Sequence, residues 1–168
     1  MTAKIEWFYS KFYDFIMFLC KLLLVADIGV TSYAVLGRYI PFIDDPAWSE
    51  EIVLTCMIYM AFLSAALAIK KQTHIRMTTL DKYLPVKVVQ ILDVFGDLMV
   101  MAFALIMLFI GGNYAMTIGA RGFYVSLPWL SKFWLYAPVA IAGFAMVIFE
   151  LEILIKHVKV LFGKGGDR

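Results

Sequence analysis

Four long apolar stretches alternate with short polar segments along the chain. The second stretch is the clearest, because Ile52 to Ile69 contains no charged residue. At about 1.5 Å rise per residue, a helix over this segment spans roughly 27 Å, close to the hydrocarbon core of a bilayer. The pattern predicts an all-α integral membrane protein, a single domain over residues 1–168, with four transmembrane helices at about residues 15–36, 46–71, 85–112 and 133–155.

The start of the second stretch carries the signals of a helix N-terminus. Asp45 is placed to cap the helix, and Pro46 suits its first position. Glu50 and Glu51 follow near the positive end of the helix dipole, where acidic side chains are favourable. These residues predict that the second helix begins at Pro46.

The third stretch opens with a polar stripe. Lys87, Gln90, Asp93 and Asp97 recur at spacings of three, three and four, so they share one helix face while apolar residues fill the rest. This pattern predicts an amphipathic, interfacial start to the third helix. Asp93 and Asp97 repel each other unless a cation lies between them, and Lys21 is a candidate partner.

The placement of basic residues predicts the orientation of the four helices. With the N-terminus inside, eleven of the 15 lysines and arginines fall in inner segments, whereas the outer loops hold three, namely Arg38, Arg121 and Lys132. Basic residues favour the cytoplasmic side. We therefore expect both termini in the cytoplasm, an N-in/C-in arrangement.

Two charged residues fall inside the first stretch. Lys21 and Asp27 also argue, with the length of this stretch, against a cleaved signal peptide. Intramembrane charge costs a few kcal/mol per group and needs a reason. Asp27 is either a proton or cation site, or a structural residue paired with a donor in a neighbouring helix or second subunit. The structural interpretation is favoured, because no second membrane carboxylate completes a proton relay.

Groups suited to chemistry are few. Cys20 and Cys56 lie within apolar stretches and show neither disulfide nor zinc spacing. His74 and His157 are predicted beyond the bilayer on the inner side, which does not suit the two axial ligands of a haem. The sequence shows no catalytic triad, glycine-rich phosphate loop or histidine metal motif. It therefore predicts neither an enzyme nor a metal, cofactor or nucleic-acid site.

The second helix also carries a face of small residues. Ala61, Ser64, Ala65 and Ala68 recur at helical spacing and permit close helix approach, which drives association in lipid. This face packs either within the four-helix unit or against another subunit, and both interpretations remain open. The chain shows neither an internal repeat nor helices broken at mid-depth, features that many secondary transporters carry. It is therefore interpreted as a scaffold rather than a carrier.

Three ordered motifs resemble a known family. They are Trp48-Ser49-Glu50-Glu51 after Arg38 and Tyr39, then Phe62-Leu63-Ser64-Ala65-Ala66 with Lys70-Lys71 and His74-Ile75, and finally Leu127-Pro128-Trp129 with Tyr136-Ala137-Pro138. Together with the length and the four spans, this set resembles the DctQ-like small membrane subunit, or Q subunit, of tripartite ATP-independent periplasmic (TRAP) transporters. Ser64, Lys71 and Thr78 depart from glycine, arginine and aspartate, which are common in the family at these positions.

The resemblance implies a scaffold in the bacterial inner (cytoplasmic) membrane. The partner it implies is a large multi-span elevator subunit, which takes up a carboxylate, such as a C4-dicarboxylate or sialic acid, with sodium. A periplasmic binding protein delivers that substrate. Sodium is expected on the large subunit, this chain holds no cofactor, and membrane lipids surround it.

The resemblance also suggests which residues meet the partners. The expected subunit interface comprises Arg38, Trp48, Glu50, Glu51, Ala61, Ser64, Ala65 and Ala68. Asp44 and Asp45 either contact a basic surface of the binding protein or act as a solvated helix cap. Two alternatives remain: a self-contained proton-coupled exporter that works as a homodimer through Asp27, and a membrane assembly or redox factor with a bound cofactor.

Overall fold

The computed structural model describes residues 3–40, 46–71 and 85–162. Its elements are α1 (Ala3–Tyr39), α2 (Ser49–Lys70), α4 (Val86–Ile106), the π-helical η1 (Met107–Gly111), α5 (Gly112–Tyr114), the π-helical η2 (Ala115–Gly119) and α6 (Phe133–Phe162). Four helices are long and apolar enough to cross a membrane, namely Trp7–Tyr39, Ser49–Lys70, Val88–Gly119 and Phe133–Val158. The prediction of an all-helical chain with four such helices is confirmed.

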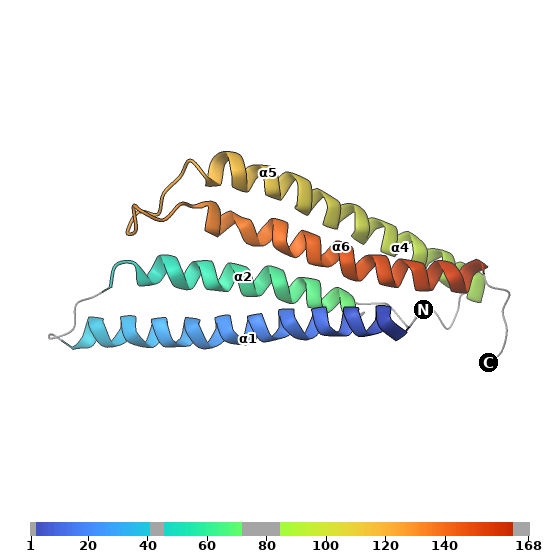
Figure 1. Ribbon diagram of the computed structural model, residues 1–168, viewed down its shortest axis with the longest axis horizontal. Helices are drawn as coiled ribbons and strands as arrows, with labels where there is room; N and C mark the ends of the chain where they lie inside the picture. Colours follow the sequence, from blue (N-terminus) through green and yellow to red (C-terminus); the bar gives the residue numbers. More distant parts are fainter. Residues whose placement is uncertain (1–2, 41–45, 72–84, 163–168) are drawn as a thin grey trace.

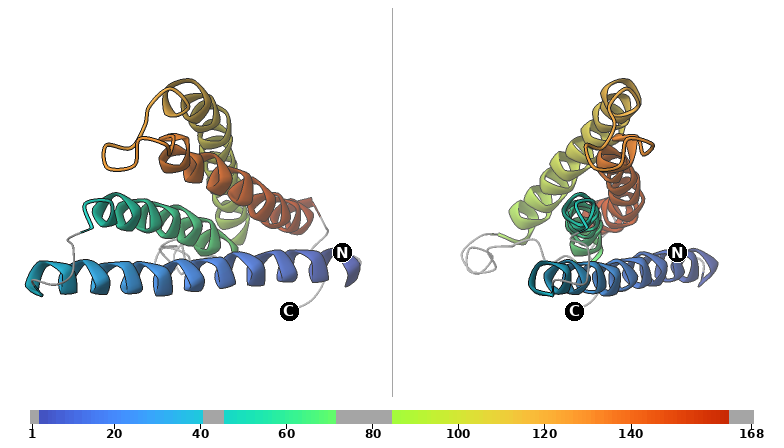
Figure 2. Two further views of the ribbon diagram at one scale, coloured as in Figure 1. Left: turned by 60° about the vertical axis from the view of Figure 1, so that its left-hand side comes forward. Right: turned by 90° about the vertical axis from the view of Figure 1, so that its left-hand side faces the viewer.

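The helices lie side by side in the order α1, α2, α6 and the third span, which runs from α4 through η2 (Figures 1 and 2). The start of α1 and the end of α6 lie at the same end of the bundle (Figure 1). In the most apolar 18-residue segment of α6, 50% of the segment is buried, whereas in the corresponding segment of α1 only 6% is buried. Helix α6 is therefore the centre of the fold, and α1 and the third span form its flanks.

Two predicted helix boundaries are wrong. The carbonyl of Pro46 accepts a hydrogen bond from the N–H of Ser49 at 2.9 Å, so Pro46 belongs to a turn and α2 begins at Ser49. Trp48 occupies the N-cap without a side-chain cap, and Asp45 lies outside the described residues. The third span does not end at Gly111–Gly112 but continues to Gly119.

Glycines hold the third span against α6. A Cβ atom on Gly143 would lie 2.7 Å from the backbone nitrogen of Leu108 and 3.1 Å from the carbonyl oxygen of Ala104. A Cβ on Gly111 would lie 2.7 Å from Cγ1 of Val139. These glycines therefore allow close approach of the two helices, the use that small residues have in membranes. Gly111 lies within the third span, where it allows close packing against α6, and it does not end the helix.

The core lies where α1, α2 and the third span pack around α6. Leu63 of α2 and Phe149 of α6 are fully buried, together with the alanines Ala66 and Ala142. The ring of Phe12 from α1 lies against that of Phe149, with centroids 5.4 Å apart. The first turns of α1, which precede the predicted span, are therefore part of the packed helix bundle.

Candidate functional site

Glu51 holds the loop between the third span and α6 against the start of α2. The placement of basic residues predicts that this end of the bundle is the outer end. The two carboxylate oxygens of Glu51 accept hydrogen bonds from the backbone N–H groups of Val125 and Ser126, at 2.8 and 3.0 Å. The loop also carries backbone hydrogen bonds of its own, from Lys132 N–H to the Gly122 carbonyl at 2.8 Å. Glu51 is thus a structural anchor within the subunit.

A second contact holds the same loop. Thr55 donates its hydroxyl proton to the Glu51 carbonyl at 2.7 Å, so the hydroxyl of Tyr124, also 2.7 Å from Thr55 Oγ1, acts as the donor in that pair. Tyr124 is buried, and burial raises the pKa of its phenol. The phenol therefore stays protonated at neutral pH, as the hydrogen bond to Thr55 requires.

Arg38 and Glu50 form an ion pair between the end of α1 and the start of α2. More than half of each side chain is exposed, so the pair adds little to stability by itself. Trp48, just before, is half-buried. Unlike Glu51, the pair of Arg38 and Glu50 presents its charges on the surface.

Asp27 lies on α1, which packs against α2. It is close enough to the Cys56 thiol to act on it electrostatically. Its Oδ1 atom is buried, and so is the hydroxyl oxygen of Tyr59, yet neither has a hydrogen-bond partner in the described part of the chain. Lys21, in contrast, is exposed on α1. Within the described residues, the neighbouring-helix donor expected for Oδ1 is therefore absent.

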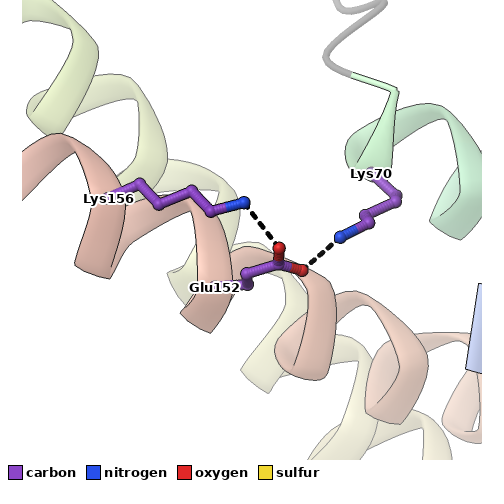
Figure 3. Close-up of polar contacts among 3 residues, drawn as sticks. All are labelled: Lys70, Glu152 and Lys156. Atoms are coloured by element: carbon purple, nitrogen blue, oxygen red, sulfur yellow. Dashed lines mark hydrogen bonds and ion pairs between the residues drawn. The ribbon is translucent and has the colours of Figure 1, made fainter. Parts of the chain in front are cut away.

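Charges gather at the other end of the bundle. Glu152 of α6 binds Lys70 of α2 through one carboxylate oxygen and Lys156, at 2.6 Å, through the other (Figure 3). The Glu152 side chain is 3% exposed, and the Lys70 ammonium also lies over the Tyr9 ring, 5.3 Å from its centroid. The cluster joins three helices. The sequence-based prediction did not include this cluster. A local signal for it exists, because an acid stands four residues before a lysine at the end of an apolar run.

Asp97 pairs with His157, whose Nδ1 lies 2.5 Å from the carboxylate. This contact joins α4 to α6 and gives Asp97 a partner other than Lys21, the candidate from the sequence. Asp93, one turn earlier, is half-buried. Glu150 is almost fully buried and close enough to Asp97 for the two acids to repel when both are charged. The polar stripe of α4 therefore faces the bundle in part.

Residues 27–160 match the family model described as "Tripartite ATP-independent periplasmic transporters, DctQ component". The chain belongs to the DctQ family. It is 26% identical, over 84% of its length, to the sialic acid TRAP transporter small permease protein SiaQ of Vibrio cholerae, and the match covers 80% of that protein. It is 27% identical, over 74% of its length, to the sialic acid TRAP transporter permease protein SiaT of Haemophilus influenzae, of which the match covers 20%.

This DctQ chain is therefore a multi-pass membrane subunit of a bacterial TRAP transporter and not an enzyme. Membership implies a large permease and a periplasmic binding protein as partners. It favours the transporter subunit over the self-contained exporter and the redox factor. Across the described ranges, no group of three or more His, Cys, Asp or Glu residues gathers to hold a metal ion.

The small-residue face of this DctQ subunit lies partly outside its own core. Ala61 and Ser64 are exposed, and the Ser64 hydroxyl donates to the Ala61 carbonyl at 2.9 Å. Ala65 and Ala68 are half-buried, and Ala65 lines an apolar groove of about 310 Å³ that reaches Phe103. Asp44 and Asp45, the candidate contacts of the binding protein, lie outside the described residues.

Proposed function

We propose that this DctQ subunit is a static scaffold for the large elevator permease of a TRAP transporter. The large permease couples sodium entry to uptake of a carboxylate, a C4-dicarboxylate or a sialic acid, delivered by the periplasmic binding protein. The observation that carries the proposal is the match to the Haemophilus permease, where the homologous region is one fifth of a much longer chain. The region therefore works next to a larger membrane unit.

The sialic acid names of both relatives favour sialic acid within the proposed carboxylate class. The described features of this chain suit support rather than transport. Glu51, Glu152 and Asp97 are each engaged in contacts that join elements of the subunit. Charged side chains used in this way hold the bundle together and leave substrate recognition to the partners.

We place the interface with the large permease along the exposed face of α2. Ala61 and Ser64 offer a smooth surface for a neighbouring helix, since small residues let two backbones approach closely in lipid. The exposed pair of Arg38 and Glu50 lies at the outer end of the same surface and adds polar contacts. Trp48 lies beside that end, whereas Glu51 contributes by holding the loop in place.

The interface is tested by adding bulk to the small face. In the double variant Ala61→Leu and Ser64→Leu, recovery of the co-expressed large permease on tagged subunit should fall about tenfold. Such a loss corresponds to the roughly 1–3 kcal/mol that overpacking costs. Sialic acid uptake by proteoliposomes should fall in parallel.

The matched control is Ala102→Leu, which adds a leucine side chain at an exposed position of the third span. It should leave recovery and uptake near the wild-type level. Unchanged recovery of the permease with the Ala61 and Ser64 variant would place the interface elsewhere. Equal loss in both variants would point to general disturbance of insertion.

A further inference from the structure

A hollow of about 460 Å³ opens at the end of the bundle where α1 starts and α2 ends. Three helices line it: α1, the end of α2 and the last turns of α6. Most of its exposed wall is apolar, although every lining residue carries a polar or charged tip. The lining residues are Ser10, Tyr13, Lys70, Lys71, Glu152 and Lys156.

The hollow holds an excess of positive charge. Three of its lining residues are lysines and one is a carboxylate, so a net charge of about +2 remains after internal pairing. Glu152 is buried between Lys70 and Lys156, and Lys70 is further held by the Tyr9 ring. Lys156, about half exposed, and Lys71, exposed at the end of α2, remain accessible.

The position of the hollow matches the depth of lipid headgroups. Lys70 is the last residue of one apolar span, and Lys156 lies just before Val158, the last residue of another. Ser10 lies near the start of the first span, which begins at Trp7. At this depth, lysine stems lie along the acyl region while their ammonium groups reach the phosphates.

We propose that this pocket binds the phosphodiester of an anionic phospholipid, of the phosphatidylglycerol class. Lys71 and Lys156 meet the phosphate oxygens, and the hydroxyl groups of Ser10 and Tyr13 donate hydrogen bonds to them. Lys70 and Glu152 fix the geometry. Basic pockets between transmembrane helices recognise anionic headgroups in this way. The apolar wall suits the glycerol and first acyl carbons, and the excess of lysines disfavours a headgroup that carries its own cation.

Native mass spectrometry of the full chain tests the proposal, with phosphatidylglycerol and phosphatidylcholine offered in equal amounts. The wild type should retain the anionic lipid preferentially, and the double variant Lys71→Gln and Lys156→Gln should lose most of that preference. A loss of about fivefold per lysine is expected. The control Lys132→Gln removes a lysine from the opposite end of the bundle and should keep the wild-type preference.

Three results would overturn the proposal. Equal retention of the two lipids by the wild type would exclude charge recognition. An equal loss in the control and in the pocket variant would show that the site is not local. Displacement of phosphatidylglycerol by an equimolar amount of inorganic phosphate would show that the pocket takes the free anion.

A second variant tests the lipid site even if the lysine substitutions disturb folding. Ser10→Ala with Tyr13→Phe removes two hydroxyl groups and leaves all charges and the Phe149 contact of the Tyr13 ring in place. It should weaken retention of phosphatidylglycerol while far-ultraviolet circular dichroism remains that of the wild type. Retention of phosphatidylglycerol at the wild-type level would show that the two hydroxyl groups do not bind the lipid.

Discussion

At the residue scale, neighbouring acids in the sequence have different roles. Glu50 and Glu51 both suit the first turn of a helix, where the dipole favours acidic side chains. In the structure Glu50 forms an exposed ion pair with Arg38, whereas Glu51 accepts two backbone hydrogen bonds from the loop before α6. One turn of sequence therefore supplies both a surface contact and an internal anchor.

The two acids give a matched pair of variants. Glu51→Ala should destabilise the subunit by about 1–2 kcal/mol, because two backbone N–H groups lose a charged acceptor. Glu50→Ala should change stability by less than about 0.5 kcal/mol, as expected for an exposed ion pair. Thermal unfolding in detergent measures both, and hydrogen exchange at Val125 and Ser126 should quicken only in the Glu51 variant. Equal exchange in the two variants would contradict the anchoring role.

At the element scale, the third span is built around its contact with α6. Two π-helical segments, Met107–Gly111 and Ala115–Gly119, interrupt it in its second half. Such segments insert an extra residue per turn and often mark functional positions. Each segment ends on a glycine that faces α6, because Gly111 and Gly119 both lie too close to α6 for a Cβ atom to fit without a shift.

Gly143 tests this packing from the α6 side. In Gly143→Ala the new methyl group would meet the backbone of Leu108 and Ala104, neither of which can rotate away. We expect a loss of about 1–3 kcal/mol of stability and a lower melting temperature. Gly96→Ala is the control, because nothing lies within 4 Å of the position that its new methyl group would take, and it should be neutral or stabilising by about 0.5–1 kcal/mol. Similar melting temperatures for the two variants would argue against close helix contact at Gly143.

At the scale of the whole molecule, the bundle is open rather than closed. α6 is the most buried of the four long helices, and α1 contributes its inner end and a single face. The flanking helices therefore keep broad apolar faces toward lipid or a larger subunit. This shape suits a piece that widens a larger assembly.

The orientation of the bundle is a prediction that labelling can decide. Arg121 and Lys71 are both exposed and lie at opposite ends of the bundle. With both termini in the cytoplasm, Arg121→Cys should react with an impermeant maleimide on intact spheroplasts, and Lys71→Cys only after permeabilisation. The wild type, whose Cys20 and Cys56 lie within membrane spans, is the blank. The reverse labelling pattern would show that both termini lie on the periplasmic side.

The sequence by itself determined the membrane class, the number of spans and the family. Apolar length and charge placement are local properties, so residues such as Ile52 to Ile69 reveal them without a partner. The ordered motifs around Trp48, Phe62 and Pro128 led to the DctQ family, which the family model then showed. Candidate interface residues on α2 could also be named, because small residues at helical spacing form one face.

Only the tertiary structure decided which polar groups meet. Glu152 with Lys70, Asp97 with His157 and Glu51 with the loop at Val125 each join elements that are distant in the sequence. The end of the third span at Gly119 could not be predicted from the sequence either. Glycine can end a helix or permit close helix packing, and the position of α6 decides which of the two applies. Contacts of this kind depend on helix order and crossing, which no local pattern encodes.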